Sequence, residues 1–131
     1  CSNTSCFLFV TEKKLSWTKA RSWCKRSGAD LATIRNKDEQ RLIKNRLPVK
    51  GPGFWIGLND RIKESKFHWV DGTPYQFRSW YGKPNGGRKE NCVELYIDKS
   101  NTQAKWNDQL CSARMYFICR EIKSKYNFSF L

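Results

Sequence analysis

The chain has 131 residues, enough for one folded domain with its own core but not for two. Hydrophobic residues make up 39 % of it and aromatic residues 15 %, a composition that argues against intrinsic disorder. Its 25 Lys and Arg against 12 Asp and Glu give a formal net charge of +13, and no apolar run approaches the roughly 20 residues of a membrane-spanning helix. We therefore expect a single domain over residues 1–131 that does not insert into a membrane.

The chain begins with a predicted strand followed by a helix. Residues 6–10 form an apolar, aromatic run of strand length. Ser16 can cap the helix, because a serine side chain accepts hydrogen bonds from the free N–H groups of the first turn, and Gly28 is its stop signal. One face of this helix collects large or apolar residues: Trp17, Ala20 and Cys24, with Trp23 beside them.

A second helix is predicted shortly afterwards. Asn36 stands three residues before Glu39, which is the spacing of a capping box, although the usual cap there is Ser or Thr. Pro48 ends this helix. We expect its buried side to consist of Leu42, Ile43 and Leu47.

The second half of the chain contains short runs typical of β-strands, separated by stretches rich in Gly, Asn and Pro: residues 54–58, 67–70, 92–97 and 116–119. Helices first and strands afterwards predict an α+β domain rather than a parallel α/β sheet. The segment from about Gly72 to Asn91 is too long and too rich in turn residues for an ordinary connection. Loops of this kind in compact domains tend to carry function.

Six cysteines, an even number, indicate three disulfides and an oxidising compartment. A zinc site is disfavoured, because no Cys-x-x-Cys occurs and His68 is the only histidine. Asn3 and Asn127 each begin a glycosylation sequon, which agrees with an extracellular location, whether secreted or as the ectodomain of a membrane protein.

Several spaced motifs then agree in order. Residues 55–58 read Trp-Ile-Gly-Leu, residues 106–108 read Trp-Asn-Asp, and residues 83–85 read Lys-Pro-Asn. This pattern resembles the long form of the C-type lectin-like domain family, in which WIGL and WND are signatures. In sugar-binding members, EPN or QPD stands where this chain has Lys-Pro-Asn. The resemblance covers nearly the whole chain, from Cys6 to Arg120. It implies two helices, antiparallel β-sheets and a long irregular loop, stapled by disulfides.

The resemblance also implies the cysteine pairing. Cys24 and Cys119 fall where the family has its long-range disulfide, and Cys92 and Cys111 match the pair at the foot of its long loop. Cys1 with Cys6 resembles the extra N-terminal pair of long-form members, which the family usually spaces more widely.

A calcium and sugar site follows from the same resemblance. Calcium prefers six to eight oxygen ligands, which carboxylates and amide carbonyls supply. In the resembling lectins, the positions of Asn85, Glu90, Asn107 and Asp108 hold a calcium ion that two sugar hydroxyls then coordinate. The expected ligand is a glycan or glycoprotein.

Lys83 departs from this pattern, because sugar-binding relatives have Glu or Gln there. An ammonium group has no acceptor and cannot ligate a cation. Two like charges in contact repel by about 1 kcal/mol in water and by several times more in a drier site. Lys83 either swings away and leaves a weaker calcium site, or its ammonium takes the place of calcium and creates a calcium-free platform.

An auxiliary calcium site is partly present. Asp60 and Glu64 match two of its family ligands, with Glu90 shared between both sites, whereas one further ligand position is Gly86. The alternative reading of Asp60 and Glu64 is a solvated acidic pair beside neighbouring cations.

The excess of positive charge is concentrated in residues 1–50, which carry 12 basic and 4 acidic residues, against 13 and 8 in residues 51–131. Lys37, Arg41 and Lys44 form one stripe on the second helix. A further cluster surrounds the first helix: Lys13, Lys14, Lys19, Lys25 and Arg26. These are either solvated helix faces or surfaces for anionic partners such as sulfated glycans or acidic proteins. Disulfides and the absence of nucleic-acid motifs argue against nucleic acid.

The tryptophans divide between core and loop. Trp80 and Tyr81, entering the long loop, are candidates either for ligand stacking or for packing beneath the loop. The predicted core aromatics are Trp23, Trp55, Trp69 and Phe117.

No catalytic motif accompanies these features, since the sequence has neither a Gly-x-Ser-x-Gly elbow nor a phosphate loop. We therefore expect a binding protein and not an enzyme. Three modes of binding stay open: calcium-assisted glycan recognition, calcium-independent protein binding through the long loop, and binding of sulfated glycans by the basic helices.

Overall fold

The computed structural model describes residues 6–82, 84, 91–97 and 103–122. In this part of the chain the elements follow in the order β1 (Phe7–Leu15), α1 (Trp17–Arg26), β2 (Ala29–Leu31), α2 (Lys37–Arg46), β3 (Phe54–Asn59), β4 (His68–Trp69), β5 (Cys92–Ile97), β6 (Ala104–Gln109) and β7 (Met115–Glu121). Both helices precede most of the strands, which confirms the α+β prediction.

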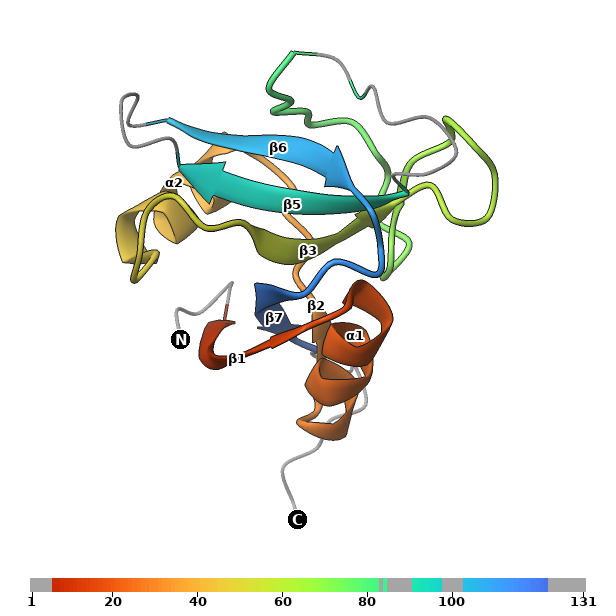
Figure 1. Cartoon of the computed structure of the whole chain (residues 1–131). Coiled ribbons are helices and arrows are strands. Elements are labelled where there is room, and N and C mark those ends of the chain that lie inside the picture. Colours follow the sequence, from red (N-terminus) through yellow and green to blue (C-terminus); the bar gives the residue numbers. More distant parts are fainter. Residues whose placement is uncertain (1–5, 83, 85–90, 98–102, 123–131) are drawn as a thin grey trace, which may run out of the picture.

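The strands form one twisted sheet with the order β1-β7-β3-β5-β6, while β2 pairs with β7 and β4 with β3. The pairing of β3 with β7 is parallel and the other strand pairs are antiparallel, so the sheet is mixed. Figure 1 shows β3, β5 and β6 in an upper layer and β1, β7 and α1 below them. The long connection after β4 lies beyond β6, at the opposite end of the molecule from α1.

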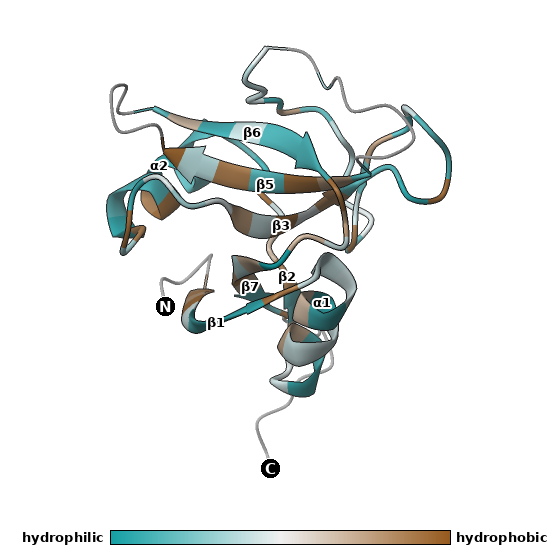
Figure 2. Ribbon diagram, viewed as in Figure 1, coloured by the Kyte–Doolittle hydropathy of each residue, from teal (hydrophilic) through white to brown (hydrophobic). Residues whose placement is uncertain are grey.

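β3 is buried along its whole length because it has a core on each face. Phe54, Ile56 and Leu58 belong to the core that also holds Trp69 and Trp106. Trp55, on the opposite face, packs in the core built from α1, β1 and β7. In Figure 2 hydrophobic residues follow β5 and the interior, whereas the middle of β1 and the last turn of α1 are hydrophilic.

α1 begins and ends where the sequence predicts. The Ser16 side chain accepts a hydrogen bond from the backbone N–H of Lys19 at 3.4 Å. Gly28 follows the helix with φ of +80°, a left-handed conformation that glycine adopts without strain. The buried Trp17 indole donates to the carbonyl of Ile56 at 2.9 Å and so fastens the helix to β3.

α2 begins with the predicted Asn36 cap. The Asn36 side chain accepts from the N–H of Glu39 at 2.9 Å. The Glu39 carboxylate accepts from the N–H of Arg35 and forms a two-pronged ion pair with the buried Arg120 of β7 at 2.7 and 2.8 Å. Of the predicted buried side, Ile43 is fully buried, while Leu42 and Leu47 are half-buried.

Three of the predicted core aromatics, Trp55, Trp69 and Phe117, are buried. Trp23 is only half-buried, because its ring packs on Phe117 but also borders a surface pocket beside α1. The short strand β2 was not predicted.

Two disulfides staple the described part of the chain. Cys24–Cys119 joins α1 to β7, and Cys92–Cys111 joins β5 to the segment after β6, as the resemblance implied. Cys6 is also disulfide-bonded, and its implied partner Cys1 lies outside the described residues. Among the described helices, neither is long and apolar enough to cross a membrane.

Candidate functional site

The long loop is attached to the outer edge of β6. Trp80 forms a parallel bridge with Trp106, the backbone N–H of Tyr81 donates to the carbonyl of Trp106 at 2.9 Å, and that of Trp106 donates to Ser79 at 2.8 Å. Because the bridge is parallel, the loop at Tyr81 runs in the same direction as β6. It therefore runs toward the end of β6 that carries Asn107 and Asp108.

Gln40 of α2 holds the junction between the long loop and β6 together by hydrogen bonds. Its side-chain amide accepts from the Trp106 indole at 3.1 Å and donates both to Ser79 Oγ and to the carbonyl of Ala104 at 3.0 Å. Gln40 is buried. This role of Gln40 was missed by the sequence analysis. The available signal was a polar residue one helical turn before Ile43, on the buried side of α2.

The structure places two of the residues of the predicted primary site, Asn107 and Asp108, next to each other on β6. Asp108 is buried and Asn107 half-buried, and consecutive strand residues project to opposite faces of the sheet. Lys83, Asn85 and Glu90 lie outside the described residues, so the convergence of the five positions stays a prediction.

Glu94 is a polar neighbour of this site that the sequence analysis missed. It is buried, and one oxygen accepts from the Asn107 amide nitrogen at 3.0 Å. Gly53 lies against its other oxygen so closely that a side-chain Cβ at that position would collide with the carboxylate. A carboxylate within the apolar run of residues 92–97 was the available signal.

Asp60, of the predicted auxiliary site, is buried rather than solvated. One carboxylate oxygen accepts from the backbone N–H of Ser65 at 2.9 Å, and the Asp60 N–H donates to the Asn91 carbonyl at 3.0 Å. The other carboxylate oxygen, Oδ1, is buried and has no hydrogen-bond partner among the described residues. A buried anionic oxygen without a donor is costly, and a bound cation removes that cost. Asp60 therefore fits a calcium ligand.

Glu64, the other described auxiliary position, is half-buried in the same turn as Asp60. Within the described part of the chain, no group of three or more His, Cys, Asp or Glu side chains gathers as a complete metal site. Glu90 and Gly86, which complete the predicted pattern, are outside that part.

An aromatic groove of about 580 Å³ opens where the long loop leaves the sheet. We call it the loop groove; it is lined by Ser65, Lys66, Phe67, Tyr75, Arg78, Trp80, Gly82 and Pro84. The Trp80 indole donates to the Tyr75 hydroxyl at 2.7 Å, and its ring lies 4.9 Å from that of Phe67. Trp80 is thus held by packing beneath the loop while bordering the groove, whereas Tyr81 is 56 % exposed.

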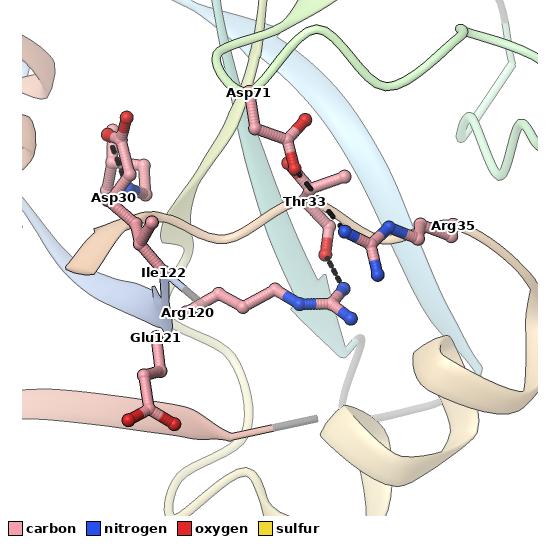
Figure 3. A pocket seen from close by; sticks show the side chains of 8 residues that line it. Asp30, Thr33, Arg35, Asp71, Arg120, Glu121 and Ile122 are labelled. Carbon is pink, nitrogen blue, oxygen red and sulfur yellow. Dashed lines mark hydrogen bonds and ion pairs between the residues drawn. The ribbon is translucent and has the colours of Figure 1, made fainter. Parts of the chain in front are cut away.

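A second cavity, of about 240 Å³, is lined by residues of β2 and β7 and of the segments that follow β2 and β4 (Figure 3). Most of its charges are already paired: Arg35 lies 3.7 Å from Asp71, Arg120 lies 2.7 Å from Glu39, and Asp30 lies 3.1 Å from Arg21. Burial alone raises the pKa of the Asp71 carboxyl, but hydrogen bonds from Thr73 and the Arg35 guanidinium outweigh it and hold that pKa below its usual value. This cavity is therefore a weaker candidate than the loop groove.

The basic stripe predicted on α2 consists of the exposed Lys37 and Arg41 and the half-buried Lys44. Asp38 lies 3.7 Å from Arg41 and offsets part of its charge. Asn3 and Asn127, the predicted glycosylation positions, lie outside the described residues.

The chain is similar in sequence to known proteins. The family model described as "Lectin C-type domain" matches residues 13–121. L-selectin of Mus musculus is 36 % identical over 123 residues, which cover 88 % of this chain and 32 % of that protein. CD209 antigen-like protein D of Mus musculus is 32 % identical over 126 residues, which cover 93 % and 50 %. The chain thus spans half the length of these relatives or less.

Two solved structures with a similar fold differ in their descriptions, one being a glycan complex and the other calcium-independent. The C-type lectin domain of murine dendritic cell inhibitory receptor 2, in complex with N-glycan, superposes with a TM-score of 0.82 at 28 % identity, covering 94 % of this chain and 99 % of that one. A calcium-independent type II antifreeze protein superposes with a TM-score of 0.80 at 27 % identity, covering 92 % and 88 %. Similarity of fold therefore does not decide calcium dependence.

Proposed function

Since the chain belongs to the C-type lectin family, whose domain model matches residues 13–121, we propose that it is an extracellular carbohydrate-recognition module. The described residues have the C-type lectin fold. Domains of this family are generally binding modules without catalytic activity, and typically extracellular. We extend both properties to this chain, as one domain over residues 1–131.

The proposed ligand is a glycan or glycoprotein, bound at the long-loop end of the sheet. The N-glycan complex of a structural neighbour that aligns over nearly its full length supports this class of ligand. The residues that we assign to the primary calcium and sugar site are Asn85, Glu90, Asn107 and Asp108. A calcium ion bound there would supply coordination positions for sugar hydroxyls.

The observation that carries the calcium part of the proposal is the Oδ1 atom of Asp60. This buried carboxylate oxygen lacks a hydrogen-bond partner among the described residues, beside the segment that enters β5. Calcium on Asp60, with Glu64 and Glu90, would stabilise the long loop that presents the primary site. Such a cation would also supply the charge compensation that a buried carboxylate needs.

Lys83 weakens the primary site, because it replaces an oxygen ligand with an ammonium group. The loop groove offers the module a contribution that does not depend on calcium. Trp80 is fixed there by Tyr75 and Phe67, and a fixed aromatic ring packs against the apolar face of a sugar at little cost in conformational entropy.

A glycan array probed in calcium and again in chelator tests the function. We expect selective glycan binding that chelator reduces strongly. In calcium, Asn107→Ala should weaken glycan binding, whereas Asn45→Ala, on the exposed surface of α2, should leave it unchanged. An array without any selective signal in either condition would refute carbohydrate recognition. Binding that chelator leaves intact would refute the role of calcium.

The alternative is a calcium-independent domain that binds a protein through the long-loop surface. The exposed Tyr81 and the substitution at Lys83 favour it, as does the calcium-independent antifreeze neighbour. Binding of a protein ligand that survives both chelator and removal of its glycans would select this alternative.

A further inference from the structure

Residues of β1 and α1 line a groove. These two elements lie at the end of the molecule opposite the long loop (Figure 1). We call it the α1 groove; it has a volume of about 450 Å³ and is lined by Lys13, Leu15, Lys19, Ser22, Trp23 and Arg26. The four helical residues are spaced i, i+3, i+4 and i+7, so they share one face of α1. Lys13 faces them from β1.

The α1 groove carries three cations and no acidic lining residue. Within the described part of the chain, none of the three has a carboxylate within salt-bridge distance, whereas Arg21, also on α1, is paired with Asp30 at 3.1 Å. The negative end of the helix dipole accounts for Arg26 in the last turn of α1. It does not account for Lys19, which lies in the first turn of α1, at the opposite end of the helix.

Trp23 forms an aromatic wall between these cations. Its ring packs against that of Phe117 in a T-shaped arrangement, with the ring centroids 5.5 Å apart. Lys13 Nζ lies 5.5 Å from the centroid of the Trp23 ring, within reach of a cation–π contact. A half-buried tryptophan, held by the core and flanked by cations that have no carboxylate partner among the described residues, offers a ligand both a packing surface and charge.

The spacing of the cations selects an extended ligand. Lys19 and Arg26 are seven residues apart, about 10 Å along a helix axis. This separation suits several anionic groups along a chain better than one compact anion. Disulfides place the protein in an oxidising, extracellular compartment, where the abundant linear polyanions are sulfated polysaccharides rather than nucleic acid.

We therefore propose that the α1 groove binds a sulfated polysaccharide, independently of calcium and of the long-loop site. The sequence analysis placed the anionic surface on Lys37, Arg41 and Lys44. That stripe includes an ion pair with Asp38, and α2 itself contains no aromatic residue, so the α1 groove is the better fit.

The test compares two variants that each remove three positive charges, Lys13→Gln/Lys19→Gln/Arg26→Gln in the α1 groove and Lys37→Gln/Arg41→Gln/Lys44→Gln on α2. Heparin is the probe, in chelator, with affinity titrated over a range of salt concentrations. For the α1-groove variant we expect about a tenfold or greater loss of affinity and a clear decrease in the salt dependence, since each released counterion adds nearly one to the slope. The α2 variant should lose much less.

Trp23→Leu keeps every charge and removes the aromatic wall; it should weaken heparin binding while thermal unfolding monitors whether the fold survives. Equal losses in the two triple variants would show that only net charge matters and would overturn the proposal. So would absence of heparin binding, or equally tight binding of single-stranded DNA. Asp60→Asn, which probes the calcium function, should leave heparin affinity unchanged, so the two proposals fail separately.

Discussion

Lys83 is the residue at which this chain departs most clearly from the sugar-binding pattern of its family. We predict that Lys83→Glu raises calcium affinity by about tenfold or more, because it removes a like charge and adds a ligand oxygen, and about 1.4 kcal/mol suffices for a tenfold change. Calorimetric titration with calcium measures the effect. Lys37→Glu, the same charge reversal on α2, is the control. An unchanged affinity in Lys83→Glu would rule out our interpretation of this position.

Asp60 has a buried carboxylate, and its Oδ1 atom has no hydrogen-bond partner among the described residues. In chelator, Asp60→Asn should unfold at the same temperature as the original protein or higher, because it removes a buried negative charge while the other oxygen can still accept from Ser65. In calcium, the original protein should gain about 2–3 kcal/mol at a calcium concentration near 100 times its Kd, and the variant should gain little. Thermal unfolding with and without calcium measures both effects, and Asp38→Asn, an exposed substitution on α2, is the control. A variant that is still stabilised by calcium would show that Asp60 is not a ligand.

At the scale of elements, the sequence predicted those features that residues close together in the chain determine, such as helix caps. Ser16 and Gly28 bound α1, and Asn36 caps α2, because caps and stops act within one helical turn. β2 escaped prediction, since its three residues pair with β7 only through tertiary structure. The half-buried state of Trp23 also depends on a contact with a distant strand, so helical periodicity alone could not reveal it.

Gly57 of β3 is explained by the packing of elements. Its backbone N–H donates to the Ala32 carbonyl at 2.8 Å, and a Cβ there would lie 2.9 Å from the Leu31 carbonyl oxygen and 2.8 Å from a Val70 methyl. We predict that Gly57→Ala destabilises the domain by about 2–3 kcal/mol through overpacking. Gly72→Ala is the control, because that position has φ of +80° and open space around it, so it should cost only about 1 kcal/mol. Urea unfolding measures both, and equal costs would contradict the steric explanation.

At the scale of the whole molecule, the ordered motifs predicted the fold, the two described disulfides and the position of the long loop. Contacts between distant segments were beyond that prediction. Gln40 reaches Trp106, Glu94 packs against Gly53, and the parallel β3–β7 pairing is set by how the chain closes. The candidate sites depend on such contacts: the burial of Asp60 and the α1 groove both require segments that the sequence separates.

The two disulfides should stabilise the molecule to different degrees and in different places. Cys24 and Cys119 are 95 residues apart, and Cys92 and Cys111 are 19 apart. Because a longer closed loop restricts the unfolded chain more, we predict that Cys24→Ala/Cys119→Ala lowers the free energy of unfolding by about 4–5 kcal/mol and Cys92→Ala/Cys111→Ala by about 3 kcal/mol. Urea unfolding at low temperature measures the difference, and the reverse order would contradict the loop-length argument. Cys92→Ala/Cys111→Ala should in addition weaken calcium and glycan binding at the long loop, yet keep heparin binding at the α1 groove, because that groove is built on the half of the fold that Cys24–Cys119 still closes.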